Sequence, residues 1–265
     1  MVNSSVTIYT LPCLSDNYAY VVYNSANGTA AIVDVPEAGP LVDKISELNV
    51  PVTDIFLTHH HSDHINGLAD LQAALTDSSS QAPAQVIGAT ADAHRLPALD
   101  QSVSPGDCLT LCGIEGYIYD VSGHTLGHLA LHLPSARAVF TADSLMAMGC
   151  GRLFEGSAAQ MWHSLQQLRS LPQDTWVYSG HEYTTSNMAF TQSLGEDNPA
   201  IAARAAQITK DRAAGRPTVP SPLALEMQTN PFMRADDPAL KAAMGMPESN
   251  AAQVFAEIRA RKDKF

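Results

Sequence analysis

Residues 58–64 read Thr58-His59-His60-His61-Ser62-Asp63-His64 and directly follow the apolar run Asp54-Ile-Phe-Leu-Thr58. Four of these side chains could bind a metal in the pattern H-x-H-x-D-H, namely His59, His61, Asp63 and His64. Imidazole and carboxylate groups suit transition metals. In a tight loop between a strand and a helix all four side chains can converge. We therefore predict a metal site at the end of this strand.

Three further candidate ligands each follow a later predicted strand. They are His124 in Ser-Gly-His-Thr-Leu-Gly-His, Asp143 in Phe-Thr-Ala-Asp-Ser and His181 in Ser-Gly-His-Glu-Tyr. Ligands at the ends of successive strands can gather at one edge of a sheet. The full set holds five histidines and two carboxylates. That is too many for one tetrahedral zinc, but it suits two metals that share a bridging carboxylate and a water. The sequence therefore predicts a binuclear site.

The apolar pattern predicts an α/β chain in which strands dominate the first two thirds and helices the remainder. Asn27-Gly28 is a favoured hairpin turn, and residues 76–84 predict a surface loop. We expect strands at 18–23, 29–34, 54–58, 85–87, 117–121, 129–133, 138–141 and 175–178, and helices at 65–75 and 158–171. Later helix signals are Asn198-Pro199, Ser221-Pro222, Asp237-Pro238 and the run Ala251 to Lys262. We predict a catalytic domain at 1–183 and a helical substrate-binding domain at 184–265.

Composition excludes several function classes. The chain has 265 residues, a net charge of -12 and 45% hydrophobic residues. The acidic charge argues against binding of nucleic acid, which needs clustered cations. Residues 1–10 lack the basic start of a secretory signal, and no apolar run has the length of a membrane span. We expect a cytoplasmic protein without membrane or nucleic-acid partners. The four cysteines are too scattered for a disulfide framework and predict buried, reduced thiols, with Cys108 and Cys112 as a remote alternative of half a zinc knuckle.

The order of these motifs resembles that of the metallo-β-lactamase-like superfamily: H-x-H-x-D-H, then G-H-T-x-G-H, an Asp after a strand, and a late G-H. The resemblance implies an αββα sandwich, here with a C-terminal helical appendage. It also implies one metal on His59, His61 and His124 and a second on Asp63, His64 and His181, with Asp143 bridging both. Asp63 and Asp143 are then the carboxylates at the catalytic centre.

Further motifs resemble those of the glyoxalase II (hydroxyacylglutathione hydrolase) family. They span the chain and are Asp16-Asn17-Tyr18, residues 58–64, Gly149-Cys-Gly-Arg-Leu-Phe-Glu-Gly156, Gly180-His-Glu-Tyr-Thr184, Asn230-Pro-Phe-Met-Arg234 and Arg259-Ala-Arg-Lys-Asp263. In that family the appendage helps to hold glutathione, which points to Arg152, Phe154, Tyr183, Arg259 and Lys262 as substrate contacts. Some members carry Tyr in place of Phe154 and Lys in place of Arg152, which puts affinity in doubt and leaves the chemistry unchanged.

The resemblance implies hydrolysis of S-(2-hydroxyacyl)glutathione, chiefly S-D-lactoylglutathione, to glutathione and D-lactate, the second step of methylglyoxal detoxification. Two metals lower the pKa of a bound water toward about 7, so a bridging hydroxide can attack the thioester. We expect two zinc ions, with iron and manganese as alternatives. We expect a monomer that takes a small glutathione thioester. The alternative function is a glutathione persulfide dioxygenase with a single iron, which would need fewer ligands than this chain carries.

Two polar residues outside the ligand set, His60 and Asp34, lie in or before the ligand segment. We expect His60 to point away from the face that its neighbours use for the metal. Asp34 ends a predicted strand and could orient a ligand or form a turn, and both roles are open at this stage.

Overall fold

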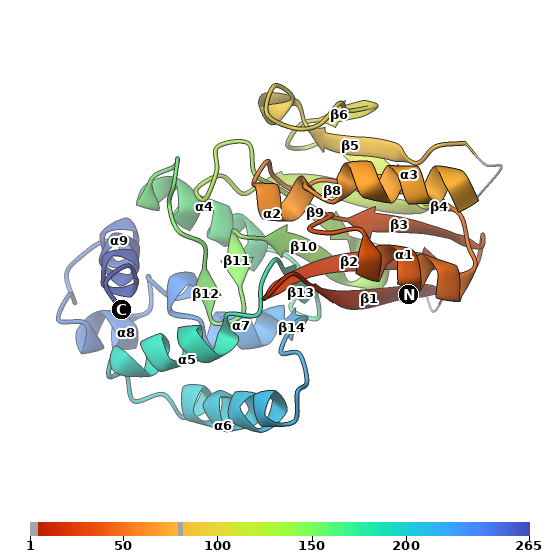
Figure 1. Cartoon of the computed structure of the whole chain (residues 1–265). Helices are drawn as coiled ribbons and strands as arrows, with labels where there is room; N and C mark the ends of the chain where they lie inside the picture. The colour runs from red at the N-terminus through yellow and green to blue at the C-terminus, as the bar shows by residue number, and fades with distance from the viewer. Residues whose placement is uncertain (1–4, 79–81) are drawn as a thin grey trace. The chain divides into compact units, whose positions relative to one another are not determined.

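The computed structural model describes residues 5–78 and 82–265 of the chain (Figure 1). The chain divides into two compact units, each built from two segments. The first unit comprises Met1–Asp120 and Gly127–Phe140, and the second comprises Val121–Leu126 and Thr141–Phe265. Within the described ranges, no helix is long and apolar enough to cross a membrane.

A six-stranded sheet in the first unit supports the strand that precedes the candidate ligands. Its order is β1-β2-β3-β4-β5-β6. The bounds are β1 (Val6–Cys13), β2 (Asn17–Asn24), β3 (Thr29–Val33), β4 (Val52–Phe56), β5 (Gln85–Ala89) and β6 (Gln101–Val103). Strands β1 to β3 pair antiparallel, and β3 to β6 pair parallel. All residues of β3 and β4 except Thr29 and Thr53 are buried, as expected of strands covered on both faces.

Three helices of the first unit follow these strands. They are α1 (Gly39–Leu48), α2 (Ser62–Ile65) and α3 (Leu68–Ser78). Helices α1 and α3 contact each other, and α1 also contacts β1 and β2 (Figure 1). Leu41 and Ile45 of α1 lie one helical turn apart and are buried, which explains how this face of the helix packs.

A second, antiparallel group of strands packs on the first sheet within the first unit. It consists of β7 (Cys108–Leu111), β8 (Ile114–Asp120), β9 (Leu129–Leu133) and the start of β10 (Ala138–Ala142). The ring centroids of Tyr20 and Phe140 lie 5.4 Å apart across this core. The Asp54 carboxylate accepts a hydrogen bond of 2.7 Å from the backbone N–H of Cys112. The core of the first unit is therefore a sandwich of two sheets.

The second unit carries most of the helices. Its strands are β11 (Leu145–Met146), β12 (Gly149–Cys150), β13 (Trp176–Ser179), which pairs with the end of β10, and β14 (Ser221–Pro222). Its helices are α4 (Ala158–Arg169), α5 (Thr184–Ser193), α6 (Pro199–Ala213), α7 (Leu223–Thr229), α8 (Pro238–Ala243) and α9 (Ala251–Lys262). Helix α9 packs on α4 (Figure 1). At this contact the ring centroids of Trp162 and Phe255 lie 6.1 Å apart.

A buried polar network on α7 holds the β11–β12 hairpin of the second unit. Glu226 is fully buried, pairs with Arg204 and accepts a 2.9 Å hydrogen bond from the backbone N–H of Met148. Asn230 donates to the carbonyls of Met146 and Gly149 at 3.1 and 3.0 Å. These bonds fix the hairpin that leads into the glycine-rich run at 149–156.

The predicted α/β class is confirmed, and most predicted elements lie within a few residues of those observed. The hairpin at Asn27-Gly28 is confirmed, since β2 pairs antiparallel with β3. The side chains of Asn198 and Asp237 cap α6 and α8 as predicted. The helix predicted at 65–75 is instead α2 and α3. The sequence patterns did not predict the helices α1 and α5 or the strands β1, β6, β7, β11 and β12.

Three predictions need correction. The signal at Ser221-Pro222 marks the start of a helix correctly, since α7 begins at Leu223, but Ser221 does not cap it: Ser221 and Pro222 form β14, and the Ser221 hydroxyl donates to the Glu226 carboxylate. The loop predicted at 76–84 is wrong at its start, because α3 continues to Ser78, and residues 79–81 lie outside the described residues. All four cysteines are free thiols, but Cys108 is exposed where a buried thiol was expected.

Candidate metal centre

The predicted ligand segment begins just after β4 and enters α2, and Asp34 holds both of its ends. Oδ1 of Asp34 accepts a 2.8 Å hydrogen bond from the Thr58 backbone N–H, and Oδ2 accepts one of 2.8 Å from the Thr58 hydroxyl. Nδ1 of His64 lies 2.8 Å from the same Oδ2. The Asp34 side chain is buried, and its backbone has a φ of 58°. Asp34 therefore closes the segment into a loop.

This closure decides which imidazole atom of His64 can bind a metal. A carboxylate at Nδ1 fixes the tautomer that carries a proton there, so Nε2 is the atom with a lone pair for a ligand. Nδ1 of His59 lies 3.1 Å from the Thr58 hydroxyl, which gives His59 the same orientation. The ring centroids of His59 and His64 are 4.3 Å apart, and those of His59 and His61 are 4.8 Å apart. The imidazoles of the segment converge.

Asn17, on β2, holds the carboxylate of the segment. Its Nδ2 donates to Oδ2 of Asp63 at 3.0 Å and to the Asp63 backbone carbonyl at 3.0 Å. Because one amide group donates to both the side chain and the backbone of Asp63, the Asp63 carboxylate is oriented before any metal binds. Asn17 is 4% exposed, whereas the Asp63 side chain is 39% exposed, so a buried amide holds a carboxylate that solvent can reach.

The second unit supplies the other three predicted ligands at strand ends. Asp143 follows β10 and His181 follows β13, and the N–H of Gly180 donates to the carbonyl of Ala142 at 3.0 Å. Oδ2 of Asp143 lies 3.3 Å from Nε2 of His124 and 3.3 Å from Nε2 of His181. Asp143 is thus placed between two imidazoles, as a bridging carboxylate requires.

The glycine-rich run at 149–156 packs directly against two of these groups. The carbonyl of Arg152 lies 2.8 Å from Nδ1 of His124, which again leaves Nε2 as the ligating atom. A Cβ at Gly151 would lie 2.1 Å from the Asp143 carbonyl oxygen and 2.8 Å from Nδ1 of His124. Only glycine allows the run to approach the site this closely.

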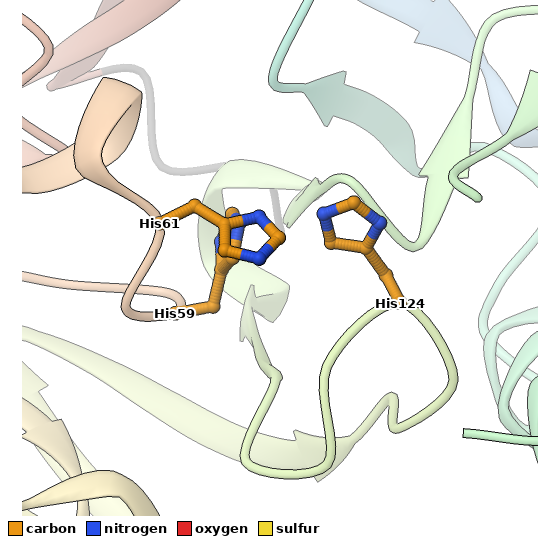
Figure 2. Close-up of side chains that lie close together, drawn as sticks. All are labelled: His59, His61 and His124. Atoms are coloured by element: carbon orange, nitrogen blue, oxygen red, sulfur yellow. The ribbon is translucent and has the colours of Figure 1, made fainter. Parts of the chain in front are cut away.

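Four of the seven predicted ligands, His59, His61, Asp63 and His64, lie in the first unit. The other three, His124, Asp143 and His181, lie in the second unit. Figure 2 shows the imidazoles of His59 and His61 beside each other at the end of the ligand segment, as their ring-centroid distance of 4.8 Å requires. Buried imidazoles and carboxylates with their outer atoms already held are the donor set that divalent transition metals take. The residues therefore fit a metal centre.

Two predicted substrate residues lie against metal-ligand candidates in the second unit. The ring of Tyr183 stacks on His181 with centroids 4.7 Å apart and an angle of 5°. The ring of Phe154 meets His124 edge-on at 5.2 Å and is 63% exposed. An exposed aromatic ring beside a ligand offers apolar surface to a bound molecule.

The two predicted cationic contacts on α9 differ in their environment. Arg259 is buried, donates to the Cys150 carbonyl at 2.9 Å and pairs with Asp263 at 2.9 Å. Lys262 is half-buried and donates to the Ser186 hydroxyl at 3.1 Å. Burial, followed by the charges of Arg259 and Arg152, lowers the pKa of Lys262 to about 8. Of the two predicted contacts on α9, the Lys262 ammonium is therefore the more available, and its charge changes near pH 8.

Comparison with known proteins identifies the superfamily to which the fold belongs. The family model described as the metallo-β-lactamase superfamily matches residues 15–181. The crystal structure of the BLEG-1 B3 metallo-β-lactamase superimposes with a TM-score of 0.65 over 86% of this chain and 99% of that chain, at 19% identity. The fold is therefore that of the metallo-β-lactamase superfamily, as predicted.

The second family model, described as the hydroxyacylglutathione hydrolase C-terminus, matches residues 182–265. A hydroxyacylglutathione hydrolase of Ruegeria pomeroyi is 55% identical over 97% of this chain and 98% of its own length. One of Roseobacter denitrificans is 51% identical over 98% of this chain and 99% of its own length. The chain belongs to the hydroxyacylglutathione hydrolase family.

Proposed function

We propose that the protein hydrolyses S-(2-hydroxyacyl)glutathione thioesters, with S-D-lactoylglutathione as its main substrate, to glutathione and a 2-hydroxy acid. The observation that carries the proposal is full-length similarity to hydroxyacylglutathione hydrolases in a chain that also holds all seven candidate ligands. The superfamily model covers residues 15–181 and the model of the hydroxyacylglutathione hydrolase C-terminus covers residues 182–265, so the match is not limited to a shared fold.

Two divalent metals, zinc in the first place, fit the ligand groups. We assign one to His59, His61 and His124 and the other to Asp63, His64 and His181, with Asp143 common to both. When bound, such a pair lowers the pKa of a water toward about 7 and polarises a carbonyl, which is the chemistry that thioester hydrolysis needs. Asp34, Asn17 and the Arg152 carbonyl orient the ligand side chains, so that little reorganisation accompanies the reaction.

Residues of the second unit are proposed to hold the substrate. Lys262 and Arg152 provide positive charge for the glutathione carboxylates in a chain whose net charge is -12. Phe154 and Tyr183 provide aromatic surface next to His124 and His181. A thiolate leaves readily, because the reference pKa of a thiol is about 8.5, so a dedicated general acid is not required.

The predicted domain boundary after residue 183 and the monomeric state stay predictions. The cytoplasm is the proposed compartment, because all four thiols are free and glutathione keeps cytosolic thiols reduced.

The test is hydrolysis of S-D-lactoylglutathione by the purified protein, followed by loss of thioester absorbance, with metal content measured on the same sample. We expect turnover with about two metals per chain. A fully metallated protein that left the thioester intact would overturn the substrate assignment. Oxygen uptake with glutathione persulfide and one iron per chain would then support the dioxygenase alternative, which does not use the group of Asp63, His64 and His181.

A further inference from the structure

Asp92 lies outside the ligand set but is buried beside the ligand segment, in the same unit. It ends the short helix η1 (Thr90–Asp92) and is 2% exposed. Its Oδ2 lies 3.1 Å from Nδ1 of His60. Its Oδ1 accepts hydrogen bonds from Nη2 and Nε of Arg95 at 2.5 and 3.2 Å. A buried carboxylate held by a guanidinium is a fixed acceptor, so Asp92 gives the His60 side chain a defined position.

His60 occupies the middle of the ligand segment, between His59 and His61. The start of the segment is fixed by Asp34 at Thr58 and by the 3.0 Å bond from the Leu129 N–H to the Thr58 carbonyl. Its far end is fixed by Asp34 at His64. Asp92 adds an anchor between these points, because holding the His60 side chain restricts rotation of the peptides on both sides of it.

Gly127 is the neighbour that makes room for this carboxylate. A Cβ at Gly127 would lie 2.2 Å from Cγ, 2.4 Å from Oδ2 and 2.5 Å from Oδ1 of Asp92. The φ of Gly127 lies outside the left-handed region, so the backbone itself would accept a side chain. The requirement for glycine therefore comes from Asp92. Gly127 is the second glycine of Ser-Gly-His-Thr-Leu-Gly-His, and metal ligation by His124 does not explain it.

We propose that Asp92 is a positioning residue of the metal centre: through His60 it sets the spacing of His59 and His61, and Gly127 exists to admit its carboxylate. This inference rests on the proposed function, because it requires His59 and His61 to bind a metal. Asp92 itself is not a ligand, and it touches neither substrate nor metal in this assignment.

The first test measures zinc affinity by competition with a chromophoric chelator, on Asp92→Asn, His60→Ala and the double variant. We expect the zinc affinity of each single variant to fall about tenfold. This is the smallest loss typical of residues that orient metal ligands. The double variant should lose no more than either single one, because both act through one contact. The matched control is Asp100→Asn, whose carboxylate caps the Val86 N–H in the same unit and should leave affinity unchanged.

The unfolding free energy of the metal-free variants separates positioning from structure. A merely structural Asp92 would lower that free energy in Asp92→Asn and leave the zinc affinity of the folded protein at the wild-type value. That result would overturn the inference. If wild-type protein binds zinc but leaves the thioester intact, the proposed function fails while a tenfold loss in Asp92→Asn still supports the positioning role.

The second test is a double-mutant cycle between positions 92 and 127. Gly127→Ala should weaken zinc binding in the wild-type background, because the new methyl group displaces the carboxylate. In the Asp92→Ala background the same change should have no further effect, since the atoms that it would meet are absent. Equal losses in both backgrounds would show that Gly127 serves something other than Asp92 and would overturn that part of the inference.

Discussion

Nδ1 of His64 lies 2.8 Å from Oδ2 of Asp34, and both side chains are buried. The contact links the end of β3 to the ligand segment and fixes the tautomer of a proposed metal ligand. Since the same carboxylate also holds Thr58, one residue orients both ends of the segment.

Asp34→Asn is expected to lower metal affinity by about 10- to 100-fold, because the amide can present its NH₂ group to Nδ1 and so disfavour the required tautomer. Chelator competition on the folded protein measures the loss. Asp54→Asn is the matched control: this buried carboxylate accepts from the Cys112 N–H, away from the ligands. Equal affinity in Asp34→Asn and wild type would contradict the role of Asp34.

Asp143→Ala should lose metal and hydrolytic activity together, because Oδ2 lies 3.3 Å from both His124 and His181. We expect the metal content to fall from about two per chain to one or fewer. Elemental analysis and the thioester assay on one sample test this. Asp236→Ala, which removes a part-exposed carboxylate paired with Arg169, should change neither quantity. An Asp143→Ala protein with two metals and full rate would rule out the bridge.

Lys262 predicts a pH dependence of KM. Its pKa is lowered to about 8, mainly by burial, so the ammonium is charged below that pH and loses its charge above it. If it binds a glutathione carboxylate, KM should rise as pH increases from 7 to 9, by up to about tenfold.

Lys262→Arg provides the control for this titration, because a guanidinium stays charged throughout the range. The ratio of KM between the wild type and Lys262→Arg removes other groups that titrate. A ratio that stays constant from pH 7 to 9 would show that the charge of Lys262 does not contribute to binding.

The Arg204–Glu226 pair predicts a large effect on stability. Glu226→Gln leaves a buried guanidinium without its carboxylate, which costs about 3 kcal/mol or more in the free energy of unfolding. Denaturant unfolding monitored by circular dichroism gives the value. The exposed pair Arg261–Glu257 is the comparison, and Glu257→Gln should cost at most about 1 kcal/mol. Similar losses in the two variants would contradict the importance of burial.

Local signals in the sequence pointed to the seven candidate ligands, because a polar cluster directly after an apolar strand is recognisable from the sequence alone. Their assignment as ligands stays a prediction. The partners that orient them were harder to find. Asn17 and Asp92 are single polar residues, and only the fold brings them to Asp63 and His60. Helix α1 begins at Gly39-Pro40 without a side-chain cap, so its start carries a weak signal.

The cations of α9 illustrate a second limit of sequence patterns. The sequence alone does not distinguish Arg259 from Lys262, because both belong to a charged helix face near residue 265. In the structure Arg259 is buried and donates to the Cys150 carbonyl, whereas Lys262 is only half-buried. Which cation is buried depends on how α9 packs on α4, and that packing is set by residues far away in the sequence.

The backbone of Asp34, with its φ of 58°, has a consequence for directed evolution. Asparagine adopts this left-handed conformation at least as readily and brings no buried charge. The amide group of Asn would nevertheless meet the Thr58 hydroxyl and Nδ1 of His64, which both lie 2.8 Å from Oδ2 of Asp34, so the exchange would leave a buried donor without an acceptor. Libraries that vary position 34 should therefore be screened for folding and for metal binding together.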